Sequence, residues 1–242
     1  WDLYEGCEHL LPEVPAMAYE DHDPQARRIF DANDWRSSTI TEEDIRRSRR
    51  AYFANISYID DKIAQILETL EATRQEAIVV FVSDHGEMLG ERGLWYKMTF
   101  YDGSSRVPLM IAAPGLAPQR IDAPVSTLDV TPTLCDLAGV SMEEITPWTD
   151  GESLVALAQG GSRSAPVCME YAAEASQAPL VSLRDGRWKL NLCTLDPDQL
   201  FDLEADPHEL TNLAGDPAHA ETLARLRAMA GARWDLARFD AE

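Results

Sequence analysis

Two adjacent polar residues, Asp84 and His85, have the types and the position that divalent metal binding requires. They follow the apolar run 77–83 (AIVVFVS) and precede Gly86. Carboxylate oxygen and imidazole nitrogen are ordinary metal ligands, and open α/β sheets place their chemistry at the carboxyl ends of strands. Because neighbouring strand residues point to opposite faces, the pair can serve one metal only where the strand ends, and Gly86 would permit that turn.

The pair has two other possible interpretations. A serine hydrolase triad built from Ser83, Asp84 and His85 is excluded, because three consecutive residues cannot reach one another in the required order. A structural role remains open, in which the aspartate caps the next turn and the histidine packs beside it. For an Asp-His pair taken alone, that structural role is the commoner one.

The residues downstream carry a more specific pattern. Positions 84–97 (DHGEMLGERGLWYK), followed by RVPL at 106–109, closely resemble the second signature of the sulfatases of the alkaline-phosphatase superfamily. The sequence of these segments is most similar to the choline-sulfatase branch of that family. Four further segments resemble this branch in the same order, so that the resemblance spans nearly the whole chain: TEEDIRRSRRAYFANISYIDDKI, STLDVTPTLCDLAGV, DGESL and LFDLEADPHELTNLAGDP.

The resemblance implies roles for three residues. Asp84 and His85 would be ligands of one divalent metal ion, and Lys97 would be the cation that contacts the sulfate or its leaving oxygen. In the family, two acidic residues near the amino terminus complete the metal site, and the nucleophile is a formylglycine hydrate. Calcium prefers all-oxygen shells, so His85 leaves the choice between Ca²⁺ and Mn²⁺ open. Without the resemblance, Lys97 would be taken for a solvated surface lysine.

The four cysteines depart from the family pattern. None of Cys7, Cys135, Cys168 and Cys193 lies in the Cys-x-Pro-x-Arg motif from which formylglycine is made. We therefore expect a carboxyl-terminal fragment of a longer enzyme, which holds half of a metal site and is inactive alone. The cysteines also form no metal-type pair, and reduced thiols in a bacterial cytoplasmic protein are expected.

Composition limits the partners. The formal net charge of −21 argues against nucleic acids and against anionic membrane surfaces. No apolar run is long enough to span a membrane. The resemblance implies a small-molecule sulfate ester, choline O-sulfate above all, and a homo-oligomeric enzyme. The sulfate group of such an ester would have to be held by local cations, because the chain as a whole repels negative charge.

The fold class expected is α/β. Positions 1–140 would form the C-terminal part of the sulfatase catalytic domain, namely the second half of an alkaline-phosphatase-like α/β sandwich with a mixed, largely parallel sheet between helices. The run 77–83 shows no alternation and predicts a strand buried on both faces. The next strand is predicted at 107–113. Positions 141–242 would form a smaller C-terminal α+β subdomain.

The first 40 residues read as largely irregular, with a short helix near 25–33. His9 and His22 fall in this segment, and as lone loop histidines they are not taken as ligands. Thr41 and Asp44 fit a capping box at the start of a long helix that reaches about residue 71. Its apolar stripe predicts packing against the sheet rather than a coiled-coil partner. The arginines of this helix read as a solvated face: Arg46, Arg47, Arg49 and Arg50.

The remaining elements are predicted from local signals. Thr131 as N-cap and Pro132 at the first position predict a helix that ends at Gly139. An Asp-Gly turn at 185–186 predicts a hairpin between strands at 181–183 and 188–192. A strand at 200–203 and a helix at 217–234 would complete the antiparallel sheet and its covering helix.

The loop after the Asp-His pair is rich in aromatic residues beside Lys97. These rings would suit a cage for the quaternary ammonium of choline, although ordinary packing under the loop is preferred. Arg106 is expected to anchor the same loop by charge-assisted hydrogen bonds. The aromatic residues concerned are Trp95, Tyr96, Phe100 and Tyr101.

Two alternatives to a sulfuric ester hydrolase stay open. A phosphonate monoester or phosphodiester hydrolase of the same superfamily would use the same metal pair and lysine. A non-catalytic relative would keep Asp84, His85 and Lys97 only to bind an oxyanion.

Overall fold

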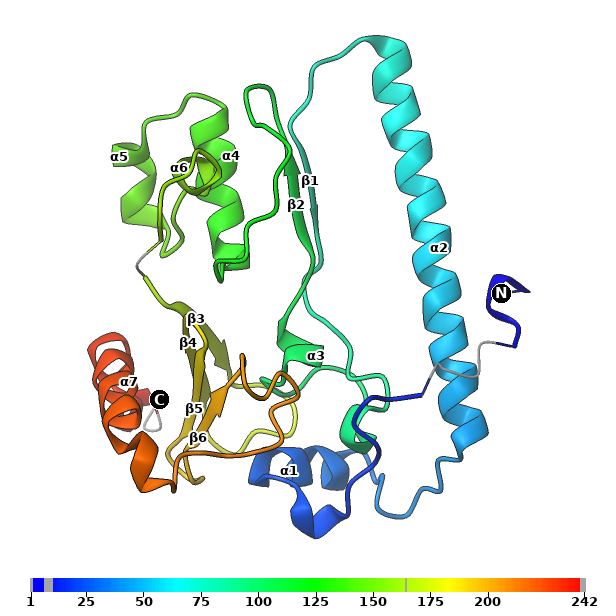
Figure 1. Ribbon diagram of the computed structural model, residues 1–242, viewed down its shortest axis with the longest axis vertical. Coiled ribbons are helices and arrows are strands. Elements are labelled where there is room, and N and C mark those ends of the chain that lie inside the picture. Colours follow the sequence, from blue (N-terminus) through cyan, green and yellow to red (C-terminus); the bar gives the residue numbers. More distant parts are fainter. Residues whose placement is uncertain (1, 7–10, 164, 240–242) are drawn as a thin grey trace. The chain divides into compact units, whose positions relative to one another are not determined.

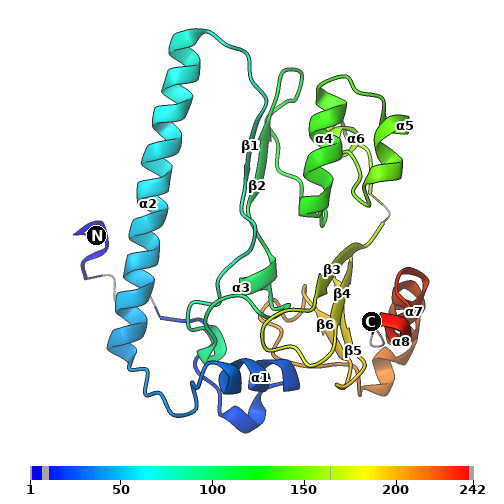
Figure 2. The same cartoon turned by 180° about the vertical axis from the view of Figure 1, so that it is seen from behind.

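The computed structural model describes residues 2–6, 11–163 and 165–239 (Figure 1; Figure 2 shows the opposite side). Cys7 and His9 lie outside these ranges. The backbone forms two compact units, one of Trp1–Val79 with His85–Val107 and one of Val80–Asp84 with Pro108–Glu242. Each unit is described by itself.

The first unit begins with short helical elements. These are η1 (Asp2–Tyr4), η2 (Tyr19–Asp21) and α1 (Pro24–Ala32). The Asp23 carboxylate caps α1 by accepting the amide protons of Gln25 and Ala26, and proline at the first helical position fits the same start. The short helix predicted near 25–33 is therefore confirmed.

Helix α2 (Glu42–Thr73) carries the predicted capping box. The Thr41 hydroxyl oxygen accepts the Asp44 amide proton at 3.2 Å, and the Asp44 carboxylate accepts the Thr41 amide proton at 3.0 Å. Both bonds satisfy donors that a helix start leaves without intrahelical partners. The helix ends where Arg74 adopts the left-handed conformation at φ 52°.

The apolar stripe of α2 does not lie in a core. No residue of α2 is buried among the described residues, and Ile56, Ile59 and Ile66 are all largely exposed. The sheet that the prediction invokes lies mainly in the other unit, so the packing of this stripe against a sheet stays a prediction. Periodicity marks which face of a helix is apolar, but it does not identify the element that covers it.

The arginine cluster of α2 is only partly solvated. Arg49 is 12% exposed and its guanidinium pairs with Glu91 at 3.2 Å, so the prediction of a solvated face was wrong for this residue. Arg46 follows the prediction and pairs with Glu42 on the helix surface.

Strands β1 (Val79–Val82) and β2 (Leu109–Ala112) form a two-stranded sheet. The chain runs along β1 and returns along β2 in the opposite direction (Figure 1). Residues 79–81 are half-buried and Val82 is exposed, so β1 lacks the burial on both faces that its sequence predicted. With one neighbour among the described strands, its faces are only partly covered.

A group of short helices follows β2. They are η4 (Thr127–Asp129), α4 (Val130–Leu137), α5 (Met142–Ile145), η5 (Thr146–Trp148) and α6 (Val155–Ala158). The predicted N-cap at Thr131 was wrong, because Ser126 begins the helical segment with a capping box to Asp129. The η4 turn runs directly into α4, so Thr131 already lies inside helical backbone.

Asp129 lies at the centre of this group and is fully buried. Its carboxylate accepts the Glu152 amide proton at 2.9 Å and pairs with the Arg163 guanidinium at 2.5 Å. Any side chain at Gly151 would clash with the backbone carbonyl of Leu128. The DGESL segment at 150–154 therefore has a structural explanation in this close approach.

The C-terminal sheet contains β3 (Val167–Tyr171), β4 (Leu180–Asp185), β5 (Trp188–Cys193) and β6 (Gln199–Asp202). Its spatial order follows the chain, β3-β4-β5-β6, and all pairings are antiparallel. Gly186 adopts φ 58° in the turn between β4 and β5, which confirms the predicted Asp-Gly hairpin. The chain continues through η6 (Pro217–His219), α7 (Ala220–Arg233) and α8 (Leu236–Phe239).

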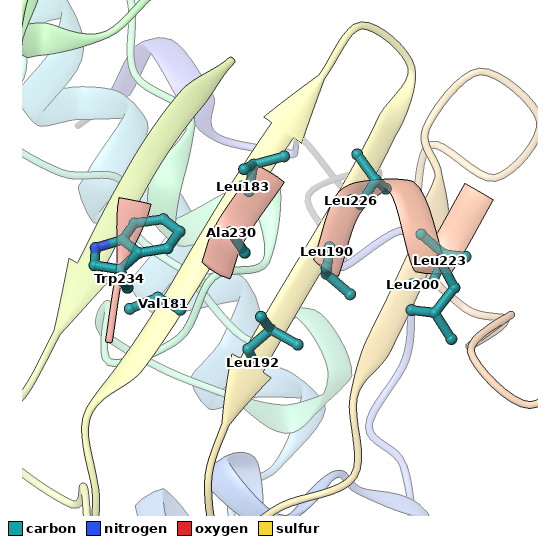
Figure 3. Packing of buried hydrophobic residues seen from close by; sticks show 9 residues of the cluster. All are labelled: Val181, Leu183, Leu190, Leu192, Leu200, Leu223, Leu226, Ala230 and Trp234. Atoms are coloured by element: carbon teal, nitrogen blue, oxygen red, sulfur yellow. The ribbon is translucent and has the colours of Figure 1, made fainter. Parts of the chain in front are cut away.

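Helix α7 covers one face of this sheet (Figure 3). Alternate strand residues point toward the helix, as the two-residue period of a strand requires. The cluster consists of Val181, Leu183, Leu190, Leu192, Leu200, Leu223, Leu226, Ala230 and Trp234. The predicted antiparallel sheet with a covering helix is confirmed.

Replacing Leu226 with alanine should lower the free energy of unfolding by about 3 kcal/mol, because a fully buried side chain would leave a cavity. Urea denaturation checks this. Leu210→Ala is the matched control, since Leu210 is 58% exposed, and it should shift the unfolding midpoint little. Equal losses in the two variants would show that the cluster under α7 is not the stabilising core.

Among the helices of the described ranges, none has the length and hydropathy that crossing a membrane requires.

Candidate active site

Asp84 and His85 lie directly after β1, where the strand has ended, and both side chains are exposed. The Asp84 carboxylate accepts a long hydrogen bond of 3.4 Å from the Ser83 hydroxyl. The predicted position at the carboxyl end of a strand is therefore confirmed, which leaves a carboxylate and an imidazole accessible side by side in sequence.

The ring of His85 has a defined tautomer. Its Nδ1 lies 2.8 Å from the Gly86 carbonyl oxygen, which can only accept a hydrogen bond. Nδ1 must therefore carry the proton in the neutral ring, and Nε2 carries the lone pair. A backbone carbonyl on one ring nitrogen is the usual way in which a protein orients the other nitrogen toward a metal.

Gly86 is required for a different reason than the sequence suggested. It is not among the residues with positive φ, so the turn does not depend on left-handed backbone at this position. Instead, a Cβ atom here would clash with the carbonyl oxygen of Gly103. The amides of Gly86 and Glu87 donate to the carbonyls of Ser104 and Gly103 at 2.7 and 2.8 Å, which holds two backbones in close contact.

The loop between His85 and Lys97 is closed by a carboxylate. Glu87 Oε1 accepts the amide protons of Leu89 at 3.1 Å and of Tyr96 at 2.6 Å. Leu89 and Tyr96 both have positive φ, at 51° and 64°. The carboxylate thus stabilises a tight backbone path that L-residues rarely adopt.

A second carboxylate, Glu91, fastens this loop to the rest of its unit. It accepts the amide protons of Glu13 and Val14 at 3.1 and 2.8 Å, and it pairs with Arg49, which also donates to the Leu89 carbonyl. This contact was not predicted from the sequence. A signal existed, because Arg49 lies on the apolar stripe of α2 between Ile45 and Tyr52. A charged side chain on an apolar stripe predicts an oppositely charged partner, because burying an unpaired charge costs free energy.

Lys97 is exposed, and its ammonium group makes no hydrogen bond or ion pair with any described residue. Its backbone is held, because its carbonyl oxygen accepts the Ser104 hydroxyl at 2.9 Å and the Thr99 amide at 2.7 Å. The backbone of Lys97 is thus held in place. Its ammonium group can bind an anion without first breaking an ion pair.

The aromatic residues near Lys97 divide into two groups. Phe100 and Tyr101 are buried, which confirms the preferred packing role. The Tyr101 hydroxyl donates to Asp23 at 3.0 Å, and the guanidinium of Arg92 lies 4.2 Å from the centre of its ring. Tyr96 is exposed and stacks on Trp35 at 6.0 Å between ring centres. The four rings of the predicted cage therefore do not share one surface.

Two remaining predictions have different outcomes. Arg106 was expected to anchor the loop, but its side chain is exposed and makes no hydrogen bond within the described ranges, so that prediction was wrong. His22 is buried against Phe30, with ring centres 4.8 Å apart. Burial lowers the pKa of His22, although the nearby Asp23 opposes this effect. The structure keeps His22 in the core of its unit.

Asp84 and His85 fit part of a divalent metal site. They offer one carboxylate and one imidazole Nε2, a donor set that suits Mn²⁺ and tolerates Ca²⁺. Within the described residues, no group of three or more histidine, cysteine, aspartate or glutamate side chains could hold a metal.

Comparison with known proteins places the chain in a class. The family model "Sulfatase" matches residues 13–140, and the model "N-sulphoglucosamine sulphohydrolase, C-terminal" matches residues 90–232. The chain belongs to the sulfatase family.

A particular relative is similar over the whole chain. Choline-sulfatase of Rhizobium meliloti (strain 1021) is 58% identical over 246 residues, which cover 100% of this chain and 48% of the relative. The chain thus spans about half the length of that relative.

Solved structures confirm the predicted fold class. A phosphonate monoester hydrolase from Silicibacter pomeroyi matches with a TM-score of 0.78 and 29% identity, over 93% of this chain and 51% of that one. A putative sulfatase from Bacteroides thetaiotaomicron VPI-5482 matches with a TM-score of 0.77 and 26% identity, over 96% of this chain and 53% of that one.

Proposed function

We propose that the natural polypeptide containing this chain is a sulfuric ester hydrolase that converts choline O-sulfate and water into choline and sulfate. The observation that carries the proposal is the 58% identity to a choline-sulfatase across the entire chain, including the segment 84–97. Asp84, His85 and Lys97 are proposed as the residues that this chain contributes to the reaction.

The proposed reaction breaks the bond between sulfur and the ester oxygen. As that bond breaks, negative charge grows on the sulfuryl oxygens and on the leaving alkoxide. A bound divalent metal would supply Lewis-acid stabilisation of this charge. Asp84 and His85 Nε2 would hold the metal, with Ca²⁺ and Mn²⁺ as the candidates.

Lys97 would contribute the positive charge that this chain itself brings to the reaction. Its ammonium group would donate hydrogen bonds to a sulfuryl oxygen or to the leaving oxygen, and it gains most where the charge is greatest, in the transition state. The nucleophile, a formylglycine hydrate in this family, is proposed to lie upstream of Trp1.

A phosphonate monoester hydrolase is the second candidate. The observation that favours it is the 0.78 TM-score with a solved enzyme of that type, at 29% identity over 93% of the chain. Phosphonate and sulfate esters place similar oxyanions before the metal and the lysine, so the residues described here would serve either reaction.

Competing assays on the natural polypeptide distinguish these candidates. We expect kcat/KM for choline O-sulfate to exceed that for a phosphonate monoester, and we expect mass spectrometry to find formylglycine in a Cys-x-Pro-x-Arg peptide. A preference for the phosphonate would select the second candidate. Turnover of neither ester, with binding of sulfate retained, would select a non-catalytic oxyanion-binding protein.

We further propose a cytoplasmic location and a homo-oligomeric state. Within the described ranges, Cys135 and Cys168 are free thiols, as a reducing compartment favours. Light scattering on the natural polypeptide tests the oligomeric state, and cell fractionation tests the location.

A further inference from the structure

One residue of the loop, Ser104, makes hydrogen bonds toward both parts of the candidate site. It lies in α3 (Asp102–Ser105) and is 4% exposed. Its backbone carbonyl accepts the Gly86 amide proton at 2.7 Å, and its hydroxyl donates to the Lys97 carbonyl at 2.9 Å. Two functional groups of the same residue therefore hold two separate segments of the loop.

The backbone side of Ser104 leads to the metal pair. The Gly86 amide donates to the Ser104 carbonyl, and the Gly86 carbonyl accepts the Nδ1 proton of His85 at 2.8 Å. The orientation of the imidazole is thus fixed by a peptide unit that is itself held by Ser104. The Gly86 amide donates to the backbone carbonyl of Ser104, so a change of the serine side chain should leave this hydrogen bond in place.

The hydroxyl side of Ser104 leads to the lysine. The Thr99 amide also donates to the Lys97 carbonyl, at 2.7 Å, but this bond closes a short turn within 97–99. The Ser104 hydroxyl ties the Lys97 carbonyl itself to the residue that pairs with Gly86. On the preceding residue, the Tyr96 amide donates to Glu87, so the chain is held just before Lys97 as well.

The ammonium of Lys97 has no partner among the described residues, so nothing at the tip of the side chain fixes its position. The placement of this cation relative to the metal pair must therefore come from its backbone. Small misplacements of a catalytic group are costly, because transition-state stabilisation depends on precise distances.

We propose that Ser104 is a positioning residue that sets Lys97 at a fixed distance from His85, an inference that rests on the proposed sulfuric ester hydrolysis. Ser104 touches neither substrate nor metal in this proposal. It acts through Lys97, and its hydroxyl is the group that does so.

The test uses the natural polypeptide and choline O-sulfate. Ser104→Ala should lower kcat on the order of tenfold, with KM changed by less than about twofold, because the lysine contact strengthens toward the transition state. Ser104→Thr keeps the hydroxyl and should restore most of kcat. Ser104→Cys, which keeps the volume but donates weakly, should behave like the alanine variant.

Ser105→Ala is the matched control. The Ser105 hydroxyl donates to the carbonyls of Phe100 and Tyr101 at 3.0 and 3.2 Å, inside its own turn and away from Lys97. Ser105→Ala removes the same kind of hydrogen bond at the next residue, so the kcat of this variant should stay near the wild-type value. Thermal unfolding midpoints and the folded fraction are measured for every variant, and kcat is expressed per folded molecule.

A double-mutant cycle decides whether Ser104 acts through the lysine. In a Lys97→Ala background, Ser104→Ala should cost less than about twofold, because the cation it positions is gone. An equal loss in both backgrounds would overturn the inference, as would a loss that only tracks the folded fraction. If Lys97→Ala itself leaves sulfate-ester turnover unchanged, the proposed role of Lys97 fails and this inference falls with it. A wild-type polypeptide that hydrolyses no sulfate ester would instead overturn the proposed function.

Discussion

Replacing His85 with alanine in the natural polypeptide should lower turnover of choline O-sulfate on the order of a thousandfold or more. A metal that polarises the sulfuryl group stabilises the transition state by several kcal/mol, and loss of a ligand removes most of that. The carbonyl of Gly86 presents Nε2 rather than Nδ1, so alanine deletes a pre-oriented ligand. Asp84→Ala should have a similar effect, because the carboxylate supplies the negative charge.

The controls for this prediction separate metal binding from folding. His85→Asn keeps a side-chain oxygen that can ligate a metal, so it should retain part of the activity. Metal content measured by mass spectrometry should fall with turnover in the alanine variants, and excess Mn²⁺ or Ca²⁺ should recover part of it. Full metal content and full turnover in His85→Ala would remove this residue from the site.

Replacing Lys97 with alanine should lower turnover by a few hundredfold, which corresponds to about 3 kcal/mol of lost charge stabilisation. The ammonium has no other partner within the described part of the chain, so its removal breaks no ion pair and should leave folding intact. The loss should appear mainly in kcat, because the charge it meets is largest when the ester bond breaks.

Lys62→Ala provides the comparison. Lys62 is an exposed lysine of α2 whose ammonium bonds to Gln65, and its removal deletes the same charge elsewhere. Its kcat and KM should stay near the wild-type values. If both lysine variants lost activity equally, the effect of Lys97 would be one of overall charge and not of position.

Local signals predicted much of the fold. The capping box of Thr41 and Asp44 and the Asp-Gly turn at 185–186 each depend on residues within four positions of one another, and both were found. Such elements are decided by short-range sterics and hydrogen bonds. The predicted cap at Thr131 was wrong, because the helical segment begins upstream of it, at Ser126.

Contacts between distant positions were not predictable in the same way. The pairing of Arg49 with Glu91, and the close approach of Gly86 to Gly103, join segments that nothing local in the chain connects. Asp84, His85 and Lys97 were proposed from a resemblance, and the structure adds hydrogen bonds at the His85 ring and at the Lys97 carbonyl. The structure also explains the glycine at position 86, because a Cβ atom there would clash with the Gly103 carbonyl oxygen. The turn alone did not explain it, since Gly86 has no positive φ.

The spatial order of the C-terminal sheet has a consequence for the time course of folding. Each strand pairs with its neighbour in sequence, across the connections 172–179, 186–187 and 194–198. Such a meander closes only small loops and gains its contacts as soon as each turn forms. Its covering helix α7 follows directly in the chain.

The pairing of β1 with β2 must instead close over residues 83–108, the whole loop that carries the candidate site. That loop also needs left-handed backbone at Leu89, Arg92 and Tyr96 before the carboxylates of Glu87 and Glu91 can accept their hydrogen bonds. We therefore expect the meander to become protected from hydrogen exchange before the loop does. Chemistry would then be the last property that a refolding molecule recovers, well after its C-terminal core has formed.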